Sequence, residues 1–314
     1  PFFITSKQKQ KQTMNTDDKE IQRMHMERID NDCYVDISES IQHPPVALSF
    51  GRYSINTPSG IKRYPIPIGT YGNFSFVSGP PKTKKTFFVS LLTSVYLSSN
   101  GKNSYGDKMR ADRKGKCVIH FDTEQGKFHA QRVFRRVVEM NNGENVGCYH
   151  TYGLRSIGYK TRIDFIDYKL RTVSEDNEIG LVVIDGIADL VSDVNSIEES
   201  NECIQRLMTW SEKYNCHIVL CIHTNNGSEK PTGHLGSFAQ KKCETGIVLE
   251  RNEMEDGMIT VRCKQSRGFS FEPFSFKVNE YGYPYIVTSL TDDLAGIEPK
   301  IKEPNKWQQK MNIA

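Results

Sequence analysis

The stretch FSFVSGPPKTKKTFFVSLL, residues 74–92, joins two apolar segments through a turn of glycine, prolines, lysines and threonine. The first segment, FSFVS, is typical of a buried strand, and the second, which continues to residue 99, is typical of a helix. A loop that leaves a strand and enters a helix gathers backbone N–H groups at the positive end of the helix dipole, where anions bind. The sequence therefore predicts a phosphate-binding loop between the two segments.

The predicted loop departs at one position from the pattern G-x-x-x-x-G-K-[ST]. Gly79, Lys85 and Thr86 match it, but Lys84 stands in place of the second glycine. Glycine supports a left-handed backbone there, which a residue with a side chain adopts at a cost of about 1–2 kcal/mol. We expect the loop to tolerate this cost, although a basic turn that never binds nucleotide is the alternative. The residues predicted to bind ATP are Gly79, Pro80, Pro81, Lys82, Thr83, Lys84, Lys85, Thr86 and Phe87.

Polar residues follow three further apolar segments that read as strands. Asp185 ends LVVID, Glu124 follows CVIHFD, and His223 ends IVLCIH. The carboxyl ends of parallel strands meet at one edge of a sheet, the usual place for ligands in such folds. We expect Thr86 and Asp185 to hold Mg²⁺ and Glu124 to polarise an attacking water, while His223 is either a sensor of the γ-phosphate or a structural residue.

The chain predicts an α/β fold. From residue 74, short apolar strands alternate with helical segments, which is typical of a mostly parallel central sheet flanked by helices. After residue 244 the pattern changes to strands and turns, which indicates antiparallel strands at the C-terminal side. We expect a basic arm and short helix over 1–45, the main domain over 46–290 with turns and short strands at its start, and a basic tail over 291–314.

Composition sets further limits on the class of protein. The eight cysteines form no C-x-x-C pair, and several lie in apolar runs, so we expect reduced thiols in the core rather than a metal site. A net charge of +3 is too small to indicate nucleic-acid binding, although local basic clusters such as KMRADRKGK, residues 108–116, could contact phosphates. With no long apolar segment and no secretory signal, we expect a cytoplasmic protein that does not enter a membrane.

With these residues assembled, the chain resembles the RecA-like P-loop ATPases, and among them the branch of RepA-type and DnaB-type hexameric helicases and related ATPases of plasmids and mobile elements. The resemblance spans about residues 70–290. The segments that carry it are GPPKTKKT, HFDTEQG, LVVIDGIADL, CIHTNN, HLGSFAQKKCETGIVLER and VRCKQSRGFSFEPFSF.

The resemblance implies roles for individual residues. Lys85 is similar to the phosphate-binding lysine, Glu124 to the glutamate that activates water, and His223 to the residue that links the γ-phosphate to a DNA-binding loop. In KQSRG, Lys264 and Arg267 resemble a basic pair inserted into the ATP site of the neighbouring subunit. The last match implies a homo-oligomer, either a ring, most simply a hexamer, or a filament.

The resemblance also places two loops in a channel that contacts DNA. The loop over residues 225–242 has glycines and the basic residues Lys230, Lys241 and Lys242, which suits the backbone of single-stranded DNA. The loop over residues 193–201 is acidic, which is unfavourable for DNA. Phe238 is the only aromatic residue of the two loops, and we expect it in the core.

Two functions follow from these observations. The first is an oligomeric ATPase that hydrolyses ATP with Mg²⁺ to act on DNA, as the helicase or loader of a plasmid, phage or mobile element. The alternative is a nucleotide-binding regulatory or scaffold protein, with weak or no hydrolysis, that assembles with a replication, recombination or mobilisation partner. Lys84 and the acidic loop favour the alternative, whereas Glu124 and Arg267 favour the first.

Overall fold

The computed structural model describes residues 16–225, 227–253 and 255–287. These residues belong to two units, 1–43 and 44–314. The polar arm before residue 16 and the predicted basic tail over 291–314 lie outside the described residues. Helix α1 (Thr16–Cys33) belongs to the first unit, and its apolar side chains are exposed, with Ile21 at 67% and Met24 at 62%.

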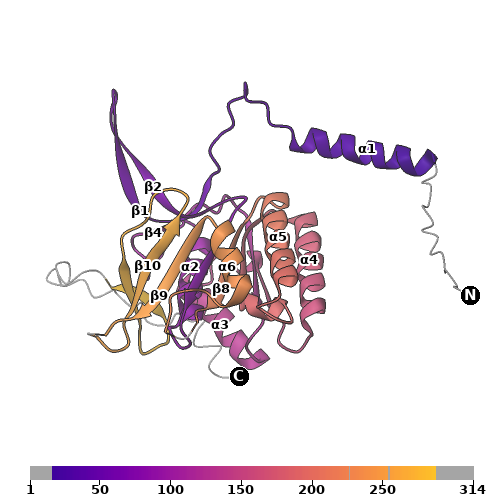
Figure 1. The fold of residues 1–314 in the computed structure, drawn as a ribbon. Helices are drawn as coiled ribbons and strands as arrows, with labels where there is room; N and C mark the ends of the chain where they lie inside the picture. The colour runs from indigo at the N-terminus through magenta and orange to yellow at the C-terminus, as the bar shows by residue number, and fades with distance from the viewer. Residues whose placement is uncertain (1–15, 226, 254, 288–314) are drawn as a thin grey trace, which may run out of the picture. The chain divides into compact units, whose positions relative to one another are not determined.

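The second unit is built on a nine-stranded sheet in the described part of the chain (Figure 1). Neighbouring strands from β9 through β6 run parallel, and β10, β11 and β12 extend the sheet in antiparallel fashion. This confirms the predicted α/β fold. In spatial order the strands are β12 (Pro284–Val287), β11 (Phe274–Val278), β10 (Ile259–Ser266), β9 (Thr245–Arg251), β3 (Phe74–Gly79), β8 (His217–His223), β7 (Ile179–Asp185), β5 (Cys117–Asp122) and β6 (Tyr149–Gly153).

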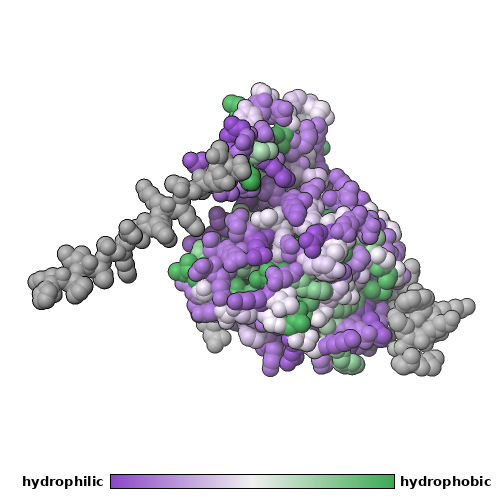
Figure 2. Space-filling view, turned by 90° about the vertical axis from the view of Figure 1, so that its right-hand side faces the viewer, coloured by the Kyte–Doolittle hydropathy of each residue, from purple (hydrophilic) through white to green (hydrophobic). Residues whose placement is uncertain are grey.

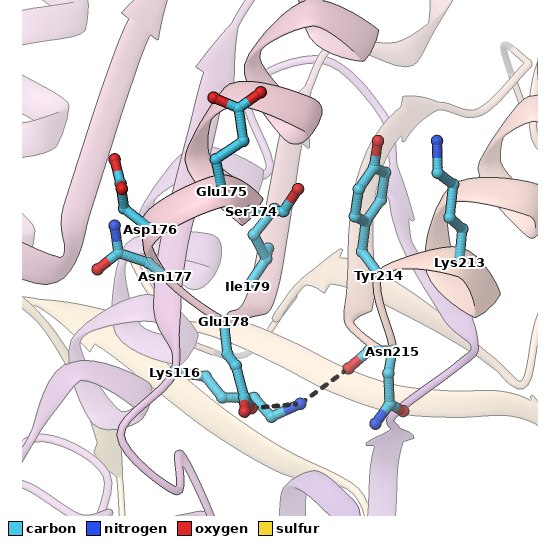
Figure 3. A pocket seen from close by; sticks show the side chains of 10 residues that line it. All are labelled: Lys116, Ser174, Glu175, Asp176, Asn177, Glu178, Ile179, Lys213, Tyr214 and Asn215. Carbon is cyan, nitrogen blue, oxygen red and sulfur yellow. Dashed lines mark hydrogen bonds and ion pairs between the residues drawn. The ribbon is translucent and has the colours of Figure 1, made fainter.

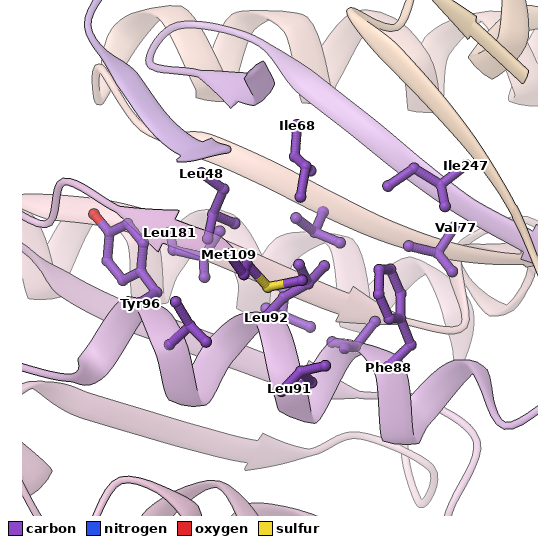
Figure 4. Close-up of a cluster of buried hydrophobic side chains, with 14 of the residues drawn as sticks. Leu48, Ile68, Val77, Phe88, Leu91, Leu92, Tyr96, Met109, Leu181 and Ile247 are labelled. Atoms are coloured by element: carbon purple, nitrogen blue, oxygen red, sulfur yellow. The ribbon is translucent and has the colours of Figure 1, made fainter. Parts of the chain in front are cut away.

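Helices cover both faces of this sheet. On one face, α2 (Lys85–Leu97) packs against the central strands beside α3 (Lys127–Met140), and its apolar side chains meet those of β3, β7 and β9 (Figure 4). The opposite face is covered by α4 (Tyr159–Asp176), α5 (Ile197–Lys213) and α6 (Gly233–Lys242). Two short 3₁₀ helices, η1 (Val146–Cys148) and η2 (Ile187–Leu190), lie in the connections. The central strands are therefore buried on both faces, as their continuous apolar sequences predict.

Helix α2 is buried on nearly all sides, since every residue from Phe88 to Leu97 is buried. Its sequence has apolar residues all round instead of on one stripe, which is typical of a helix enclosed by protein. The α2 face that does not meet the large sheet contacts α3 and strand β4 (Met109–Ala111). The helix that follows the loop thus has little freedom to move.

The segment before the loop forms longer strands than the sequence predicts. Strands β1 (Val46–Thr57) and β2 (Gly60–Thr70) make an antiparallel hairpin, and β4 joins it in a separate three-stranded sheet of order β2-β1-β4. Pro65 and Pro67 lie within β2, and their missing N–H groups are tolerated because β2 is an edge strand. The sequence predicts only turns and short strands here, because prolines are typical of turns and the local sequence does not reveal that β2 is an edge strand.

The C-terminal part of the predicted DNA loop is a helix. Residues from Gly233 onward form α6, in which Leu235, Gly236 and Ala239 are buried. A side chain on Gly236 would clash with the Pro231 backbone, since its Cβ would lie 2.5 Å from the Pro231 carbonyl carbon. The glycine therefore serves close packing at this position, where the sequence suggested flexibility.

The positions of the cysteines agree only in part with the prediction that they lie in the core. All eight cysteines are free; five of them are buried, whereas Cys33 is exposed and Cys148 and Cys263 are partly exposed. No described helix is long and apolar enough to cross a membrane. Hydrophilic residues predominate on the face of the molecule seen in Figure 2, where hydrophobic residues form small separate patches.

A buried histidine makes the stability of this fold depend on pH. His120 lies in β5 with no exposed surface, its Nδ1 lies 2.9 Å from the Tyr149 hydroxyl, and its ring meets Phe134 edge to face. Burial lowers the pKa of His120 to about 3 from its ordinary 6.5. The unfolded chain therefore binds a proton at this residue below pH 6.5 that the folded chain does not bind.

We predict that His120→Gln weakens the acid dependence of stability. The contribution of neutral His120 is fully present above pH 6.5 and is lost as the pH falls toward 3, by about 1.4 kcal/mol per pH unit. Urea unfolding of both proteins between about pH 7.5 and pH 5 measures the difference, in which other titrating groups cancel. A difference that does not change with pH would show that His120 is protonated in the folded protein.

Candidate functional site

The loop between β3 and α2 has the backbone that a phosphate-binding loop requires. Lys84 precedes α2 with φ 59° and ψ 33°, the left-handed conformation expected of a glycine at this position. Lys82 also has a positive φ, 65°. At the start of the loop a Cβ on Gly79 would lie 2.7 Å from both the Leu249 carbonyl oxygen and the Thr83 hydroxyl oxygen. Glycine is thus needed at 79, and Lys84 adopts the loop conformation without it.

The Lys85 ammonium group lies inside the loop. Its Nζ donates hydrogen bonds to the carbonyl oxygens of Gly79 and Pro80, at 3.0 and 3.2 Å, and to His223 Nδ1 at 3.1 Å. Only 9% of the residue is exposed. Burial lowers the pKa of Lys85, and the nearby Cys221, Glu124 and Asp185 oppose this shift. The loop carbonyls and His223 thus fix the position of this cation inside the loop.

Lys85, His223 and Glu124 form a chain of polar contacts across three strand ends. Because an ammonium group can only donate, the contact with Lys85 makes His223 Nδ1 the acceptor and leaves the proton on Nε2. That Nε2 faces Glu124 Oε1 at 3.6 Å. The histidine is the main cause that lowers the pKa of Glu124, which is therefore ionised at neutral pH.

Asp122 and Asp185 are the buried carboxyl groups beside this chain. They end neighbouring strands and are paired in the β5–β7 register. Burial is the main cause that raises both pKa values, that of Asp122 to about 6, and the negative charges of Asp185 and Glu124 raise the pKa of Asp122 further. The Thr86 hydroxyl and the Cys221 thiol lower the pKa of Asp185 in part. One carboxyl oxygen of each aspartate, Oδ2, is buried without a hydrogen-bond partner in the described part of the chain.

The unpartnered oxygens of Asp122 and Asp185 indicate whether the site can hold a metal ion. Carboxylate oxygen and hydroxyl are ligands that Mg²⁺ prefers, and a buried acceptor without a donor is stabilised by a cation. The Asp185 carboxyl group and the Thr86 hydroxyl lie together, so the residues present fit such an ion. Asp122 has a second task, because its Oδ1 accepts hydrogen bonds from the Glu124 and Gln125 N–H groups at 3.1 and 2.8 Å.

Glu124 is also positioned by a glycine that follows Asp185. Gly186 has φ 105°, and a Cβ there would lie 2.4 Å from the Thr123 hydroxyl oxygen and 2.7 Å from Glu124 Cγ. The Thr123 hydroxyl lies 2.7 Å from the Gly186 carbonyl oxygen, to which it donates. The backbone after β7 thus packs closely against the turn after β5, and this contact fixes the position of the Glu124 side chain.

The other predicted loop residues have different surroundings. Pro80, Pro81 and Lys82 are exposed, while Thr83 is buried and donates to the Pro80 carbonyl oxygen at 2.8 Å. The Phe87 side chain packs on the core, and the Arg136 guanidinium lies 3.8 Å from its ring centroid. Phe87 can therefore offer a ligand its backbone but not its ring.

Lys264 and Arg267 lie apart from the loop of their own chain. Lys264 Nζ donates to the Glu229 carbonyl oxygen at 2.8 Å and pairs with its carboxylate at 3.4 Å. Arg267 donates to the Lys242 carbonyl oxygen at 2.7 Å. Through the strand register, Ser266 aligns with Thr245, which aligns with Ser75 near the start of β3. Arg267 is thus near the amino edge of the sheet, opposite the loop.

The three lysines proposed for DNA do not form one cluster with the loop. Lys230 is exposed in the turn after β8, and Lys241 and Lys242 are exposed in the last turn of α6. Lys241 Nζ lies 5.8 Å from the Phe238 ring, and that ring packs against the core as expected. Cations in the last turn also stabilise the helix through its dipole, so structure alone accounts for part of this pattern.

Two of the cavities bear on this assignment. One of about 630 Å³ is at the amino edge of the sheet, where Lys116 Nζ contacts the Asn215 carbonyl oxygen and the Glu178 carboxylate (Figure 3). Its contacts are structural and it lies away from the loop. Another, of about 680 Å³, opens between the start of α3 and the end of β6, next to Glu124, with Lys127 and Arg155 in its lining.

Fold and site together define a P-loop nucleotide-binding protein: a RecA-like sheet with a lysine-bearing loop at the carboxyl edge of a central strand. The model of a family described as "AAA domain" matches residues 57–229, which is more than half of the chain. The chain belongs to this family of P-loop NTPase domains. No curated protein matches the chain.

Sequence reasoning missed three residues that shape the site. Asp122 accepts hydrogen bonds from the N–H groups of the two residues that begin the turn, Glu124 and Gln125. Aspartate commonly bonds the following backbone in this way, so its place at the end of a strand is a sequence signal for such a turn. Gly186 is required after Asp185, which its place after a strand-end aspartate could have suggested. Cys221 lies beside Asp185, and nothing in its sequence context distinguishes it from the other core thiols.

We predict that Lys84→Gly stabilises the protein relative to Lys84→Ala. Both variants lose the exposed hydrogen bond from Lys84 Nζ to the Gly257 carbonyl oxygen, but only glycine relieves the left-handed backbone. The expected difference in the free energy of unfolding is about 1 kcal/mol. Glycine relieves the backbone strain, but its greater conformational entropy in the unfolded chain offsets part of that gain. Urea unfolding measures it. Equal stability of the two variants would mean that the loop is not strained at Lys84.

Proposed function

We propose that the protein is an ATPase that binds ATP with Mg²⁺ at the β3–α2 loop and hydrolyses it. The observation that carries the proposal is the chain of contacts from Lys85 through His223 to Glu124 at the carboxyl edge of the sheet. The three side chains lie at the start of α2, at the end of β8 and in the turn after β5. A phosphate-binding cation and an ionised carboxylate lie there on the two sides of one neutral imidazole. This arrangement suits the cleavage of a terminal phosphate.

Each residue would perform a separate task. Lys85 would exchange its bonds to the loop carbonyls for phosphate oxygens, and the loop N–H groups and the N-terminus of α2 would add to its attraction. The Thr86 hydroxyl and the Asp185 carboxylate would hold Mg²⁺, which when bound neutralises charge on the phosphates. The neutral His223 would sense whether nucleotide is bound, because Lys85 donates both to it and to the loop carbonyls.

Glu124 would orient the attacking water. Its lowered pKa keeps it ionised at neutral pH, so it can accept a hydrogen bond from the water and draw off a proton as the phosphate bond breaks. About half of its side chain, 45%, is exposed, so a water can reach it. Asp122 and Gly186 act as positioning residues, through the backbone on either side of Glu124.

Assembly would complete the site. Arg267 is about 13 Å of strand away from the level of the loop in its own chain, four residues along β3. Only a neighbouring copy could present it to the phosphates, and the groove beside Glu124 gives room for a side chain from outside. We infer a homo-oligomeric ring or filament in which Lys264 and Arg267 act in trans. An arginine supplied in this way contributes about 10³–10⁵ in rate.

The action on DNA is the finer part of the proposal. The resemblance to RepA-type and DnaB-type helicases supports it, together with the exposed Lys230, Lys241 and Lys242 beyond the strand that ends in His223. Such a protein would act as a helicase or loader of a plasmid, phage or mobile element, with replication or mobilisation proteins as partners.

A second candidate is a nucleotide-gated regulator or scaffold with weak hydrolysis. The backbone strain at Lys84 favours it, and so does the acidic loop before α5, where Glu199 accepts hydrogen bonds from Ser192 and would repel DNA. In this case ATP would control assembly with a partner instead of driving movement.

We predict that Lys85→Ala and Glu124→Gln both abolish ATP turnover but differ in binding. Lys85→Ala removes the phosphate cation and should weaken nucleotide binding at least tenfold, whereas Glu124→Gln leaves the loop intact and should keep ATP bound. Phosphate release and the fluorescence of a labelled ATP analogue measure the two properties. Normal turnover by Glu124→Gln would show that another group activates the water.

Turnover of the parent protein against protein concentration, with and without single-stranded DNA, separates the two candidates. A rate per molecule that rises with concentration and with DNA supports the assembling ATPase. Bound ATP without turnover supports the scaffold.

We predict that two inactive variants restore each other when mixed. Lys85→Ala has an intact Arg267, and Arg267→Ala has an intact loop, so a mixed assembly contains complete sites between unlike neighbours. Turnover of the mixture should exceed the sum of the separate variants by tenfold or more. Mixing Lys85→Ala with Glu124→Gln is the matched control, because both lesions lie in the same site and no complete site can form. Equal behaviour of the two mixtures would exclude Arg267 as a residue that acts in trans.

A further inference from the structure

The β1–β2 hairpin presents an aromatic stack at its surface. Tyr53 and Tyr64 are directly opposed in the register, and their rings lie 5.6 Å apart at 27°. Phe269, which follows β10, stacks on Tyr53 with centroids 4.0 Å apart at 29°. The two end rings stay accessible, with Phe269 54% and Tyr64 38% exposed. Three rings from three segments thus form a short stack whose ends face solvent.

The hairpin is basic and contains no acid. Residues 46–70 include Arg52, Lys62 and Arg63 but neither Asp nor Glu, whereas the whole chain has 41 basic and 38 acidic residues. All three side chains are exposed, and in the described residues none makes a salt bridge. Strand alternation places Lys62 on the face of the tyrosines and Arg52 and Arg63 on the opposite face.

A groove of about 720 Å³ lies on the arginine face, near the base of the hairpin. Arg52 and Arg63 line it with Lys108 and Arg110, and the acids in its lining are Asp107 and Asp112. Asp112 already pairs with Lys114 at 3.8 Å. The groove therefore has an excess of positive charge, and it includes part of the basic cluster KMRADRKGK whose role the nucleotide site does not explain.

The hairpin begins at the edge of the sheet opposite the nucleotide site. The Thr70 N–H donates to the Glu244 carboxylate at 2.7 Å, and the Gly72 N–H donates to the Cys216 carbonyl oxygen at 3.0 Å. Both contacts lie at the amino ends of the strands that carry the loop and His223. The distal half of the hairpin projects from the unit (Figure 1). It is thus separate from Lys230 in the turn after β8, whereas Lys241 and Lys242 end α6 just before Glu244, at the edge where the hairpin is rooted.

We propose that this hairpin, with Phe269, binds single-stranded nucleic acid. Bases would stack on the open faces of Phe269 and Tyr64, where Lys62 lies on the same face to contact phosphates. Arg52, Arg63 and the groove would hold the phosphate backbone where the strand passes to the opposite face of the hairpin. The ligand is single-stranded because the flat faces of bases are covered in a duplex. A second copy of this chain fits less well, since the hairpin offers cations without acids and would repel itself. The inference deepens the proposed function and rests on its action on nucleic acid.

Binding of a fluorescein-labelled oligothymidine of about 20 nucleotides, measured by anisotropy without nucleotide, tests the proposal. Phe269→Leu keeps an apolar side chain but removes the ring, and it should weaken binding roughly 5- to 150-fold, the loss of one base stack. The triple variant Arg52→Gln, Lys62→Gln, Arg63→Gln should weaken binding and reduce the slope of log K against log salt by about 2, at about 0.7 per contact.

The matched control is the triple variant Lys160→Gln, Arg171→Gln, Lys213→Gln, which removes the same charge from exposed positions on α4 and α5. The proposal predicts that this control keeps the parent salt slope, and that a duplex of the same length binds the parent more weakly than the oligothymidine does. Equal effects of both triple variants, or an unchanged affinity of Phe269→Leu, would overturn it.

Two further readouts keep this test separate from the ATPase. Turnover of the parent protein without DNA reports on the proposed function alone, so its absence leaves the binding result valid. Sedimentation of the hairpin triple variant reports on the alternative use of this surface. A shift from oligomer to monomer would make the hairpin a contact between copies and would overturn the proposal.

Discussion

The ammonium group of Lys85 holds the candidate site together, because it donates at once to two loop carbonyls and to the imidazole of His223. The loop backbone cannot satisfy these carbonyls by itself, and the imidazole needs a donor to fix its tautomer. One buried cation meets both needs. The parallel pairing of β3 with β8, which sets Gly79 opposite His223, brings the partners within reach. Removal of the charge at Lys85 would therefore also release the histidine.

The same histidine is tied to the segment that follows it. The His223 carbonyl oxygen accepts hydrogen bonds from the Thr232 N–H and hydroxyl groups, both at 2.9 Å. Between these residues, Glu229 pairs with Arg262 at 2.7 Å and with Lys264. A continuous set of contacts thus joins Lys85 to one of the two cations proposed to act in trans. Any shift of His223 on ligand binding has a physical route to the subunit contact, although coupling also requires that the segment has two stable arrangements.

The sequence predicted those parts of the molecule in which local pattern and burial agree. The strands that end in Gly79 and Asp185, and helix α2, have continuous apolar sequences. Such sequences are expected of segments that are buried on both faces. The length of the hairpin strands is not predicted, because prolines such as Pro65 and Pro67 are typical of turns. Their tolerance depends on β2 being an edge strand, which local sequence does not reveal. Helix α6 was missed because Gly233 and Gly236 suggest a loop, and the reason for Gly236, contact with Pro231, is tertiary. Within the site, the sequence identified Lys85, Glu124, Asp185 and His223 as residues at one edge, but the contacts between them depend on register.

The two ends of β8 show how the nucleotide site and the basic hairpin are related. His217 begins this strand, with Nδ1 donating to the Thr70 carbonyl oxygen at 2.9 Å and Nε2 accepting from the Ser75 hydroxyl at 2.9 Å. It thus fixes the root of the hairpin to the strand that carries the loop, and its ring fills the space that a side chain on Gly69 would occupy. His223 ends the same strand at the nucleotide edge. Because β8 is a buried central strand between β3 and β7, it holds these two points at a constant separation and cannot bend to connect them. Communication between nucleotide and a strand of nucleic acid would then arise from movement of whole subunits against each other. Arg267 is suitably placed for this, because it lies near the sheet edge at which the hairpin is rooted.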